Sequence, residues 1–326
     1  MTFDHELKAR RAFKHLEDLD SEVKGWIAGD HYSVRYEYDP EARWTGDLSN
    51  PDDLGTYLLA SSIFIPGIGP QTAPPNIEFG QGRFTAFATV EDPPSDTIGV
   101  LIGDFLHNLR SALDNLAFAL ATTYTQPLPD EITAGSEFPV FGDENGEGSA
   151  RFHRLRSKGS LKGTPAPASG LDKIRGWHPD AQTVVERLQP YNRENSYLDD
   201  PLWILHVLDR IDKHRLVHTA SAASAGILWH IAGDNHERGP KDVRCIGPGL
   251  IRSFGGPVGT DTPISDIWGI HPIDPSADVD MEIDPAPEIA FAPDTPIVGR
   301  KLVMVTLAEL YNYVAGTVIP ALAPYL

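Results

Sequence analysis

Two stretches of the sequence carry ionisable side chains at spacings that can support chemistry. Arg110 and Asp114 are four residues apart in a run without proline, so one helical turn would bring them together. Further along the chain, four ionisable residues follow one another: Asp212, Lys213, His214 and Arg215. An imidazole can act as a general acid or base, and a guanidinium can stabilise negative charge in a transition state. Together, these residue types suit acid–base chemistry on an anionic substrate.

The first of these stretches is predicted to be a helix over residues 97–123. At about 100° per residue, its larger apolar side chains fall on one arc: Ile98, Ile102, Phe105, Leu106, Leu109, Leu113, Leu116 and Leu120. Beside that arc, His107, Arg110 and Asp114 share a stripe with small residues. Small side chains allow another element to approach, which favours a cleft-facing cluster. A simple ion pair at the edge of the core explains the same pattern, so both interpretations remain open.

The second stretch is predicted to be a helix over residues 201–219. Its apolar residues point in nearly every direction around the axis, which is typical of a central, buried helix. At least one of its four consecutive ionisable residues must then face inward. A buried charge costs several kcal/mol unless it is paired. We therefore expect this helix to pack against residues 97–123 and to find its partners there.

These expectations define a candidate site between the two helices. Arg110 would bind an anion, and His214 would act as the acid or base. Asp114 and Asp212 would orient these two groups. Further binding contacts would come from His107, Lys213 and Arg215.

A metal ion is an alternative use of the second helix. A stripe at intervals of four residues contains His206, Arg210, His214 and His218, and two histidines four residues apart can bind a metal. The glutamate of a metalloprotease motif is absent from this stretch. A pH-sensitive cluster or solvated imidazoles is the preferred interpretation, so we predict neither a metal nor a cofactor.

The two helical strings resemble those of a family of uncharacterised bacterial and phage-associated proteins. The resemblance rests on residues 103–114, which read GDFLHNLRSALD, and on residues 212–215, which read DKHR. A fainter resemblance is to HEPN-type helical proteins, many of which are ribonucleases or toxins in which four to six residues lie between an Arg and a His. In this chain, three residues separate Arg210 from His214. The resemblance implies an RNA-acting or defence-associated enzyme, and a homodimer. The alternative is a non-enzymatic interaction protein whose charges form a buried structural network.

Charge is unevenly distributed along the chain. Residues 149–170 contain no acid but several bases: Arg151, Arg154, Arg156, Lys158 and Lys162. This basic island could hold RNA or another phosphate-bearing ligand, or it could be a solubilising loop. Residues 253–299 contain no Lys or Arg, and acids alternate with apolar residues from Asp278 to Asp284. A solvated edge strand is the preferred interpretation of that alternation.

Composition narrows the protein class. The chain has 326 residues, a net charge of −19 and a single cysteine, Cys245. This excludes a disulfide framework and favours a reducing, cytoplasmic location. No apolar run reaches the roughly 18 residues that a membrane span needs, so we predict no membrane association.

The order of helical and strand-like segments predicts an α+β fold, with a helical bundle core and antiparallel β segments packed alongside. We expect one large domain over residues 1–326 with β insertions. The helical core would comprise residues 97–123, 179–219 and 302–319, and the β-rich segments residues 32–90 and 221–292. The strands before residue 91 are expected to form a meander. The apolar stretch Glu137–Phe141 would be a small buried plug.

Overall fold

The chain has an α+β fold in the computed structural model, with helices and antiparallel sheets in different parts of the sequence. The structure describes residues 4–29, 31–43, 58–59, 82–193, 196–213, 219–223, 228–231, 243–253, 256–272, 281–284 and 287–326. Two compact units divide the chain. One comprises Met1–Lys24, Ser95–Thr219 and Phe291–Leu326, and the other comprises Gly25–Pro94 and Ala220–Ala290. The division falls close to the predicted bounds of the helical and β-rich segments. Their membership of one large domain stays a prediction.

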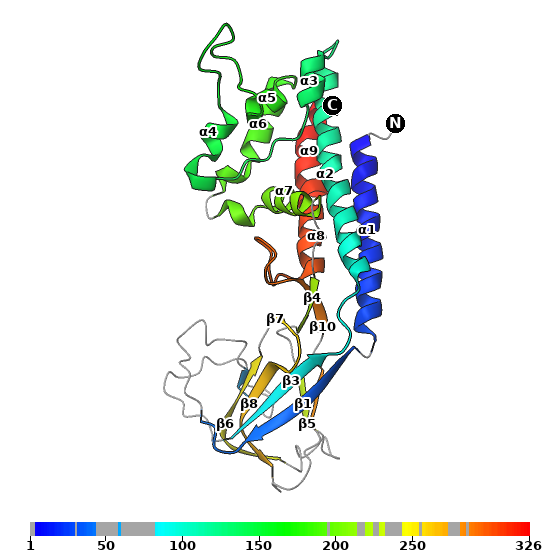
Figure 1. The fold of residues 1–326 in the computed structure, drawn as a ribbon, viewed down its shortest axis with the longest axis vertical. Helices are drawn as coiled ribbons and strands as arrows, with labels where there is room; N and C mark the ends of the chain where they lie inside the picture. The colour runs from blue at the N-terminus through cyan, green and yellow to red at the C-terminus, as the bar shows by residue number, and fades with distance from the viewer. Residues whose placement is uncertain are drawn as a thin grey trace. The chain divides into compact units, whose positions relative to one another are not determined.

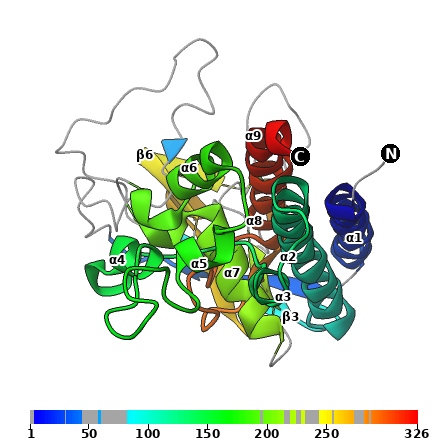
Figure 2. The same cartoon turned by 90° about the horizontal axis from the view of Figure 1, so that it is seen from above.

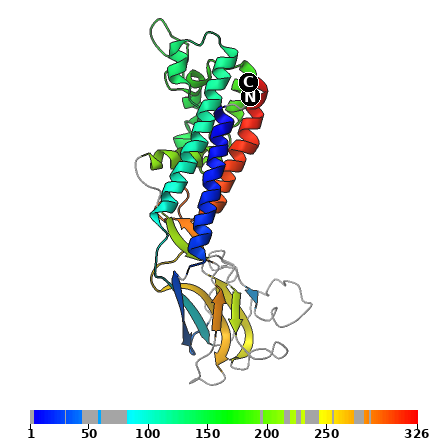
Figure 3. The same ribbon diagram turned by 90° about the vertical axis from the view of Figure 1, so that its right-hand side faces the viewer.

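The first unit is helical, and its long helices run side by side (Figures 1 and 3). They are α1 (Asp4–Ile27), α2 (Asp96–Tyr124) and α8 (Val303–Tyr313), which continues through a π-helical turn (Val314–Val318) into α9 (Ile319–Leu322). The rings of Phe13 and Tyr311, 5.2 Å apart, join α1 to α8. The shorter helices of the unit are α3 (Asp130–Gly135), α4 (Gly148–Phe152), α5 (Gly170–Ile174), α6 (Pro179–Arg187) and α7 (Pro201–Asp212).

Helix α2 forms as its sequence predicts. The Ser95 hydroxyl accepts a hydrogen bond from Thr97 N at 3.0 Å and caps the first turn. All eight residues of the predicted apolar arc are buried. The polar stripe therefore lies beside the buried face of the helix. Two of its residues, Arg110 and Gly103, are buried as well.

Helix α7 is shorter than predicted. The Asp200 carboxylate caps its start by accepting from Leu202 N at 2.8 Å, and Pro201 occupies the first turn. Its capping residue at the other end is Lys213, and a strand already begins at Thr219. The predicted helix over 201–219 is therefore wrong at Lys213 and at Thr219, because apolar periodicity alone does not register where a helix gives way to a strand. Residues 214–218 lie outside the described residues. The predicted burial is confirmed from Leu202 to Leu205.

The second unit is built on a five-stranded antiparallel sheet in the order β1-β3-β8-β6-β2. The strands are β1 (Tyr32–Asp39), β2 (Leu58–Leu59), β3 (Arg83–Val90), β6 (Val243–Ser253) and β8 (Thr262–Pro272). The remaining strands form two smaller sheets: β4 (Thr219–Ala223), β7 (Gly256–Pro257) and β10 (Pro287–Phe291) in one, β5 (Leu228–Ile231) and β9 (Met281–Asp284) in the other.

The predicted meander is only partly correct. Strands β1 and β3 do pair, with Tyr32 opposite Val90 and Asp39 opposite Arg83. Strand β2 lies at the far edge of the sheet, where it pairs with β6. Strands from residues 32–90 and from residues 243–272 therefore lie side by side in one sheet, whose small core contains Ala86, Ala88 and Ile264.

Candidate functional site

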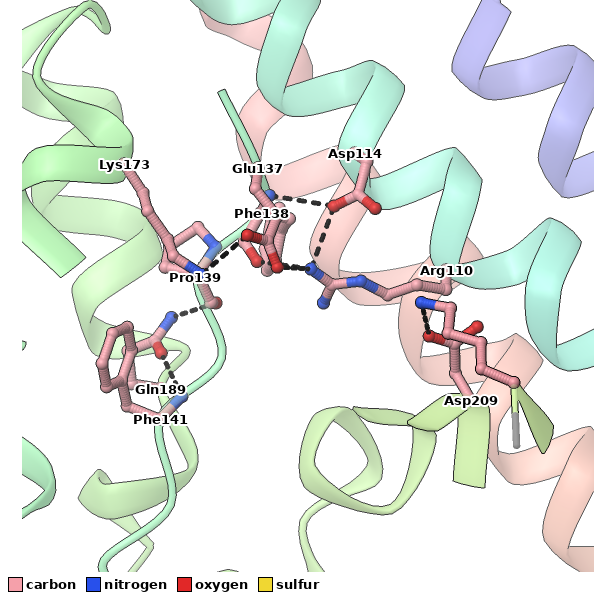
Figure 4. A network of polar contacts seen from close by, with 10 residues as sticks. Arg110, Asp114, Glu137, Phe138, Pro139, Phe141, Lys173, Gln189 and Asp209 are labelled. Atoms are coloured by element: carbon pink, nitrogen blue, oxygen red, sulfur yellow. Dashed lines mark hydrogen bonds and ion pairs between the residues drawn. The ribbon is translucent and has the colours of Figure 1, made fainter. Parts of the chain in front are cut away.

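Arg110 lies in the interior of the helical unit, where α2 meets a short extended segment (Figure 4). Its side chain is 6% exposed. Nη2 donates to Phe138 O at 2.8 Å and to Glu137 Oε1 at 3.2 Å, and it forms an ion pair with Asp114 Oδ1 at 3.0 Å. The two hydrogen bonds occupy both hydrogens of Nη2, and the Asp114 carboxylate adds a charge contact. Nη1 is buried and has no hydrogen-bond partner among the described residues.

The extended segment is residues 137–141, called here the anchor segment. It is the predicted plug: Phe138, Val140 and Phe141 are buried. Phe138 is held at both backbone groups, because its N–H donates to Asp114 Oδ1 at 3.0 Å and its carbonyl accepts from Arg110. The pair Arg110–Asp114 thus acts as a clamp on the two backbone groups of one residue.

The other end of the anchor segment is held by Gln189, which is 1% exposed. Its Nε2 donates to Pro139 O and to Val185 O, both at 3.0 Å, and its Oε1 accepts from Phe141 N at 3.0 Å. A buried extended segment outside any sheet must find partners for its backbone groups. Here side chains of α2 and of the turn after α6 supply them.

Glu137 extends the network toward α5 through an ion pair with Lys173, with Nζ 2.9 Å from Oε2. Burial alone would raise the pKa of the Glu137 carboxyl, but Lys173 and Arg110 outweigh it and lower that pKa. Burial raises the pKa of Asp114, although Arg110 and the Phe138 amide oppose this. Two cations, Arg110 and Lys173, therefore face two carboxylates.

The contact between α2 and α7 lies further along the same stripe. A Cβ placed on Gly103 would lie 2.3 Å from Asp212 Oδ1, so the absence of a side chain there admits the carboxylate. Burial and the charges of Asp209 and Asp104 raise the pKa of Asp212. Asp209 is 4% exposed, and its carboxylate pairs with Lys213 Nζ at 2.6 Å. The predicted approach of Asp212 to α2 is present.

The structure brings together only part of the predicted site. Arg110 and Asp114 pair as expected, but the acceptors around Arg110 come from its own helix and the anchor segment. His107 is exposed on α2. His214 and Arg215 lie outside the described residues, so the predicted pairing of Arg110 with His214 stays a prediction.

His206 is the described histidine of the α7 stripe. It is partly buried, and its ring centroid lies 5.5 Å from that of Trp203. Burial and the nearby cations, above all Arg110 and Arg210, lower its pKa to about 4. The imidazole is therefore neutral at pH 7 and cannot donate a proton as an acid there. Within the described part of the chain, no three His, Cys, Asp or Glu side chains are placed to hold a metal ion.

The basic island, predicted to be loop-like, begins inside helix α4. Arg151 pairs with Glu144 at 2.8 Å, and Arg154 Nη2 donates to Pro167 O at 2.8 Å. Arg156 is half-buried and makes no ion pair within the described residues. Arg151 also lies over the ring of Phe141 in the anchor segment, 5.8 Å from its centroid. None of the three forms a hydrogen bond or ion pair with the Arg110 network in the described part of the chain.

Sequence reasoning missed Glu137, Lys173, Gln189 and Asp209. A usable signal was present for the first of them. Glu137 is the first residue of the predicted plug, and a buried arginine must have acidic partners. The sequence held no comparable signal for Lys173, Gln189 and Asp209, because their positions in the structure depend on how distant segments pack.

None of the helices in the described part of the chain is both long and apolar enough to span a membrane. Comparison of the chain with protein-family models, curated proteins and solved structures found no match.

Proposed function

We propose that the protein is a non-enzymatic interaction protein and that the Arg110 network is structural. One observation carries this proposal: Nη2 of the buried guanidinium already donates to two acceptors of its own chain and forms an ion pair with a third group, the Asp114 carboxylate. A cation that stabilises a substrate anion must be free to face it. Arg110 faces Asp114 and Glu137 instead.

The charge balance of the network supports the same conclusion. A site for an anionic substrate needs an excess of positive charge, whereas Arg110 and Lys173 are matched by Asp114 and Glu137. The geometry also gives the Arg110–Asp114 pair a structural role. The anchor segment connects α3 to the region of α4, and the clamp satisfies backbone groups that have no strand partner. A network of this kind orders a surface that other molecules can bind.

The test combines stability with an assay for RNA cleavage. Arg110→Ala should lower the free energy of unfolding by about 1–3 kcal/mol, because it leaves the buried Phe138 carbonyl without its donor and the partly exposed carboxylates of Asp114 and Glu137 without their cation. The matched control is Arg10→Ala, at an exposed position of α1, which should change stability by less than about 0.5 kcal/mol. Urea unfolding measures both values.

The same preparations are incubated with labelled single-stranded RNA. The proposal expects intact RNA with every variant. It is wrong if the wild-type protein cleaves RNA and a folded His214→Ala variant does not. It is equally wrong if Arg110→Ala keeps full stability, because the network would then not be structural.

A further inference from the structure

The chain from Arg154 to Ala166 is an ordered hairpin, called here the basic hairpin. Arg156 N donates to Thr164 O at 2.9 Å and Gly163 N donates to Arg156 O at 3.0 Å. Ala166 N donates to Arg154 O at 2.9 Å, and a bridge joins Leu155 to Pro165. In Figures 1 and 2 it is the loop that leaves α4 and returns to α5. The backbone that carries these side chains is therefore held by its own hydrogen bonds.

The base of the hairpin is fixed in the helical unit. Phe152, at the end of α4, is fully buried, and its ring lies 5.6 Å from that of Phe141 and 5.9 Å from that of Tyr191. Gly170, at the start of α5, packs directly on this ring, because a Cβ there would lie 2.1 Å from Phe152 Cδ2. The ring thus links the base of the hairpin to the anchor segment.

The charges of the hairpin are largely uncompensated. Residues 148–171 contain no Asp or Glu. Within the described part of the chain, Arg156, Lys158 and Lys162 make no ion pair, and both lysines are exposed. This contrasts with a chain whose net charge is −19. A cluster of unpaired cations on an acidic protein attracts anionic partners to one place.

Two exposed leucines accompany these cations. Leu155 is 49% exposed and Leu161 is 53% exposed, and neither contributes to the core. Exposed aromatic rings are what single-stranded nucleic acids stack on. The hairpin has no aromatic residue, and the nearby Phe152 is buried. Protein interfaces instead combine apolar contacts with a charged rim.

We infer that the basic hairpin binds an acidic protein segment in which apolar side chains are interspersed among the carboxylates. Lys158, Lys162 and Arg156 pair with the carboxylates, and the leucines contact the apolar side chains. This inference rests on the proposed function, since it names the chemistry of the partner that a non-enzymatic interaction protein would bind.

The test uses three labelled probes and fluorescence anisotropy. Two are synthetic peptides of equal length and equal glutamate content, one with interspersed leucines and the other with serines in their place. The third is a single-stranded oligouridine of matching charge. The full-length protein is compared with two variants: Arg156→Gln/Lys158→Gln/Lys162→Gln, which removes the charges, and Leu155→Ser/Leu161→Ser, which removes the apolar contacts.

The matched control is Arg10→Gln/Arg11→Gln/Lys24→Gln, which removes the same charge from exposed positions of α1. We expect the wild type to prefer the leucine peptide over the serine peptide and over oligouridine. The charge variant should bind the leucine peptide about tenfold more weakly. Each exposed ion pair contributes only part of the binding free energy, and the three lost pairs together give this factor. The leucine variant should no longer distinguish the two peptides, and the control should bind as the wild type does.

Several outcomes overturn the inference. It is wrong if the wild type does not bind the leucine peptide, or if the control variant weakens binding as much as the charge variant does. Tighter binding of oligouridine that the leucine variant retains would assign the hairpin to nucleic acid. Electrophoresis of the oligouridine after the titration distinguishes failure of the proposed function from failure of this inference. Cleavage of the RNA would contradict the proposed non-enzymatic function. Intact RNA together with absent peptide binding would contradict only the inferred binding role of the basic hairpin.

Discussion

The helical unit contains two clusters of cations that differ in burial and in ion pairing. In the anchor network, Arg110 is buried and shared among acceptors of its own chain. In the basic hairpin, Lys158 and Lys162 are exposed and make no ion pair with described residues. A buried charge must be compensated inside the protein because leaving water costs several kcal/mol. An exposed charge is solvated and stays available to a partner. The comparison therefore separates charges that maintain the fold from charges that can bind.

The largest effect is expected where the two regions share a core residue. Phe152→Ala removes a fully buried ring between the base of the hairpin and Phe141. It should lower the free energy of unfolding by about 3–5 kcal/mol, the usual cost of such a cavity. Urea unfolding measures it, with Leu155→Ala at an exposed position of the hairpin as the control. Equal effects of the two variants would contradict the division into a buried base and an exposed tip.

A pH effect should follow from His206, beside the anchor network. Its folded-state pKa is about 4, below the usual 6.5. As pH falls from 6.5 to 4, the unfolded chain binds the proton first, so stability is lost across this window. At 1.36 kcal/mol per pH unit, the full loss is about 3 kcal/mol.

Urea unfolding at pH 7 and at pH 4.5 tests this expectation. The His206→Gln variant should lose less stability between the two pH values than the wild type does. The carboxylates titrate in both proteins, so the difference isolates the imidazole. If both proteins lose the same amount, His206 does not make this contribution.

A smaller effect is expected at the outer edge of the network. Glu137 is 50% exposed and pairs with Lys173 as well as with Arg110. Glu137→Gln keeps the shape and a carbonyl acceptor, so it should cost only about 1 kcal/mol. Combining it with Lys173→Met should cost less than the two single changes added, because the pair is lost only once. Strict additivity in chemical unfolding would show that this ion pair contributes nothing.

The smallest effect is expected in the basic hairpin. Replacing Arg156, Lys158 and Lys162 together with glutamine should change the free energy of unfolding by less than about 0.5 kcal/mol, since none makes an ion pair with described residues. Thermal melts at low and high salt measure it. A loss above about 2 kcal/mol would mean that these cations maintain the fold, and the contrast with Arg110 would disappear.

Local patterns predicted the elements that position the site. The spacing of leucines along α2 indicated which face is buried and placed Arg110 and Asp114 one turn apart. The apolar run before Gly142 indicated the anchor segment, and the absence of acids around Lys158 indicated the basic island. That the island forms a hairpin was not predicted. The end of α7 and the place of β2 in its sheet were not predicted. Both depend on pairing between distant segments, which periodicity does not register.

The sequence by itself determined the α+β class, the apolar face of α2, the i, i+4 pair of Arg110 and Asp114, and the uneven distribution of charge. Only the tertiary structure decided which side chains complete the pair. Glu137, Lys173 and Gln189 reach the network because the anchor segment packs between α2 and the turn after α6. The physical reason is that a buried charge requires a partner but does not specify it. Packing of the apolar side chains brings particular carboxylates and amides within hydrogen-bond distance of the guanidinium and the segment.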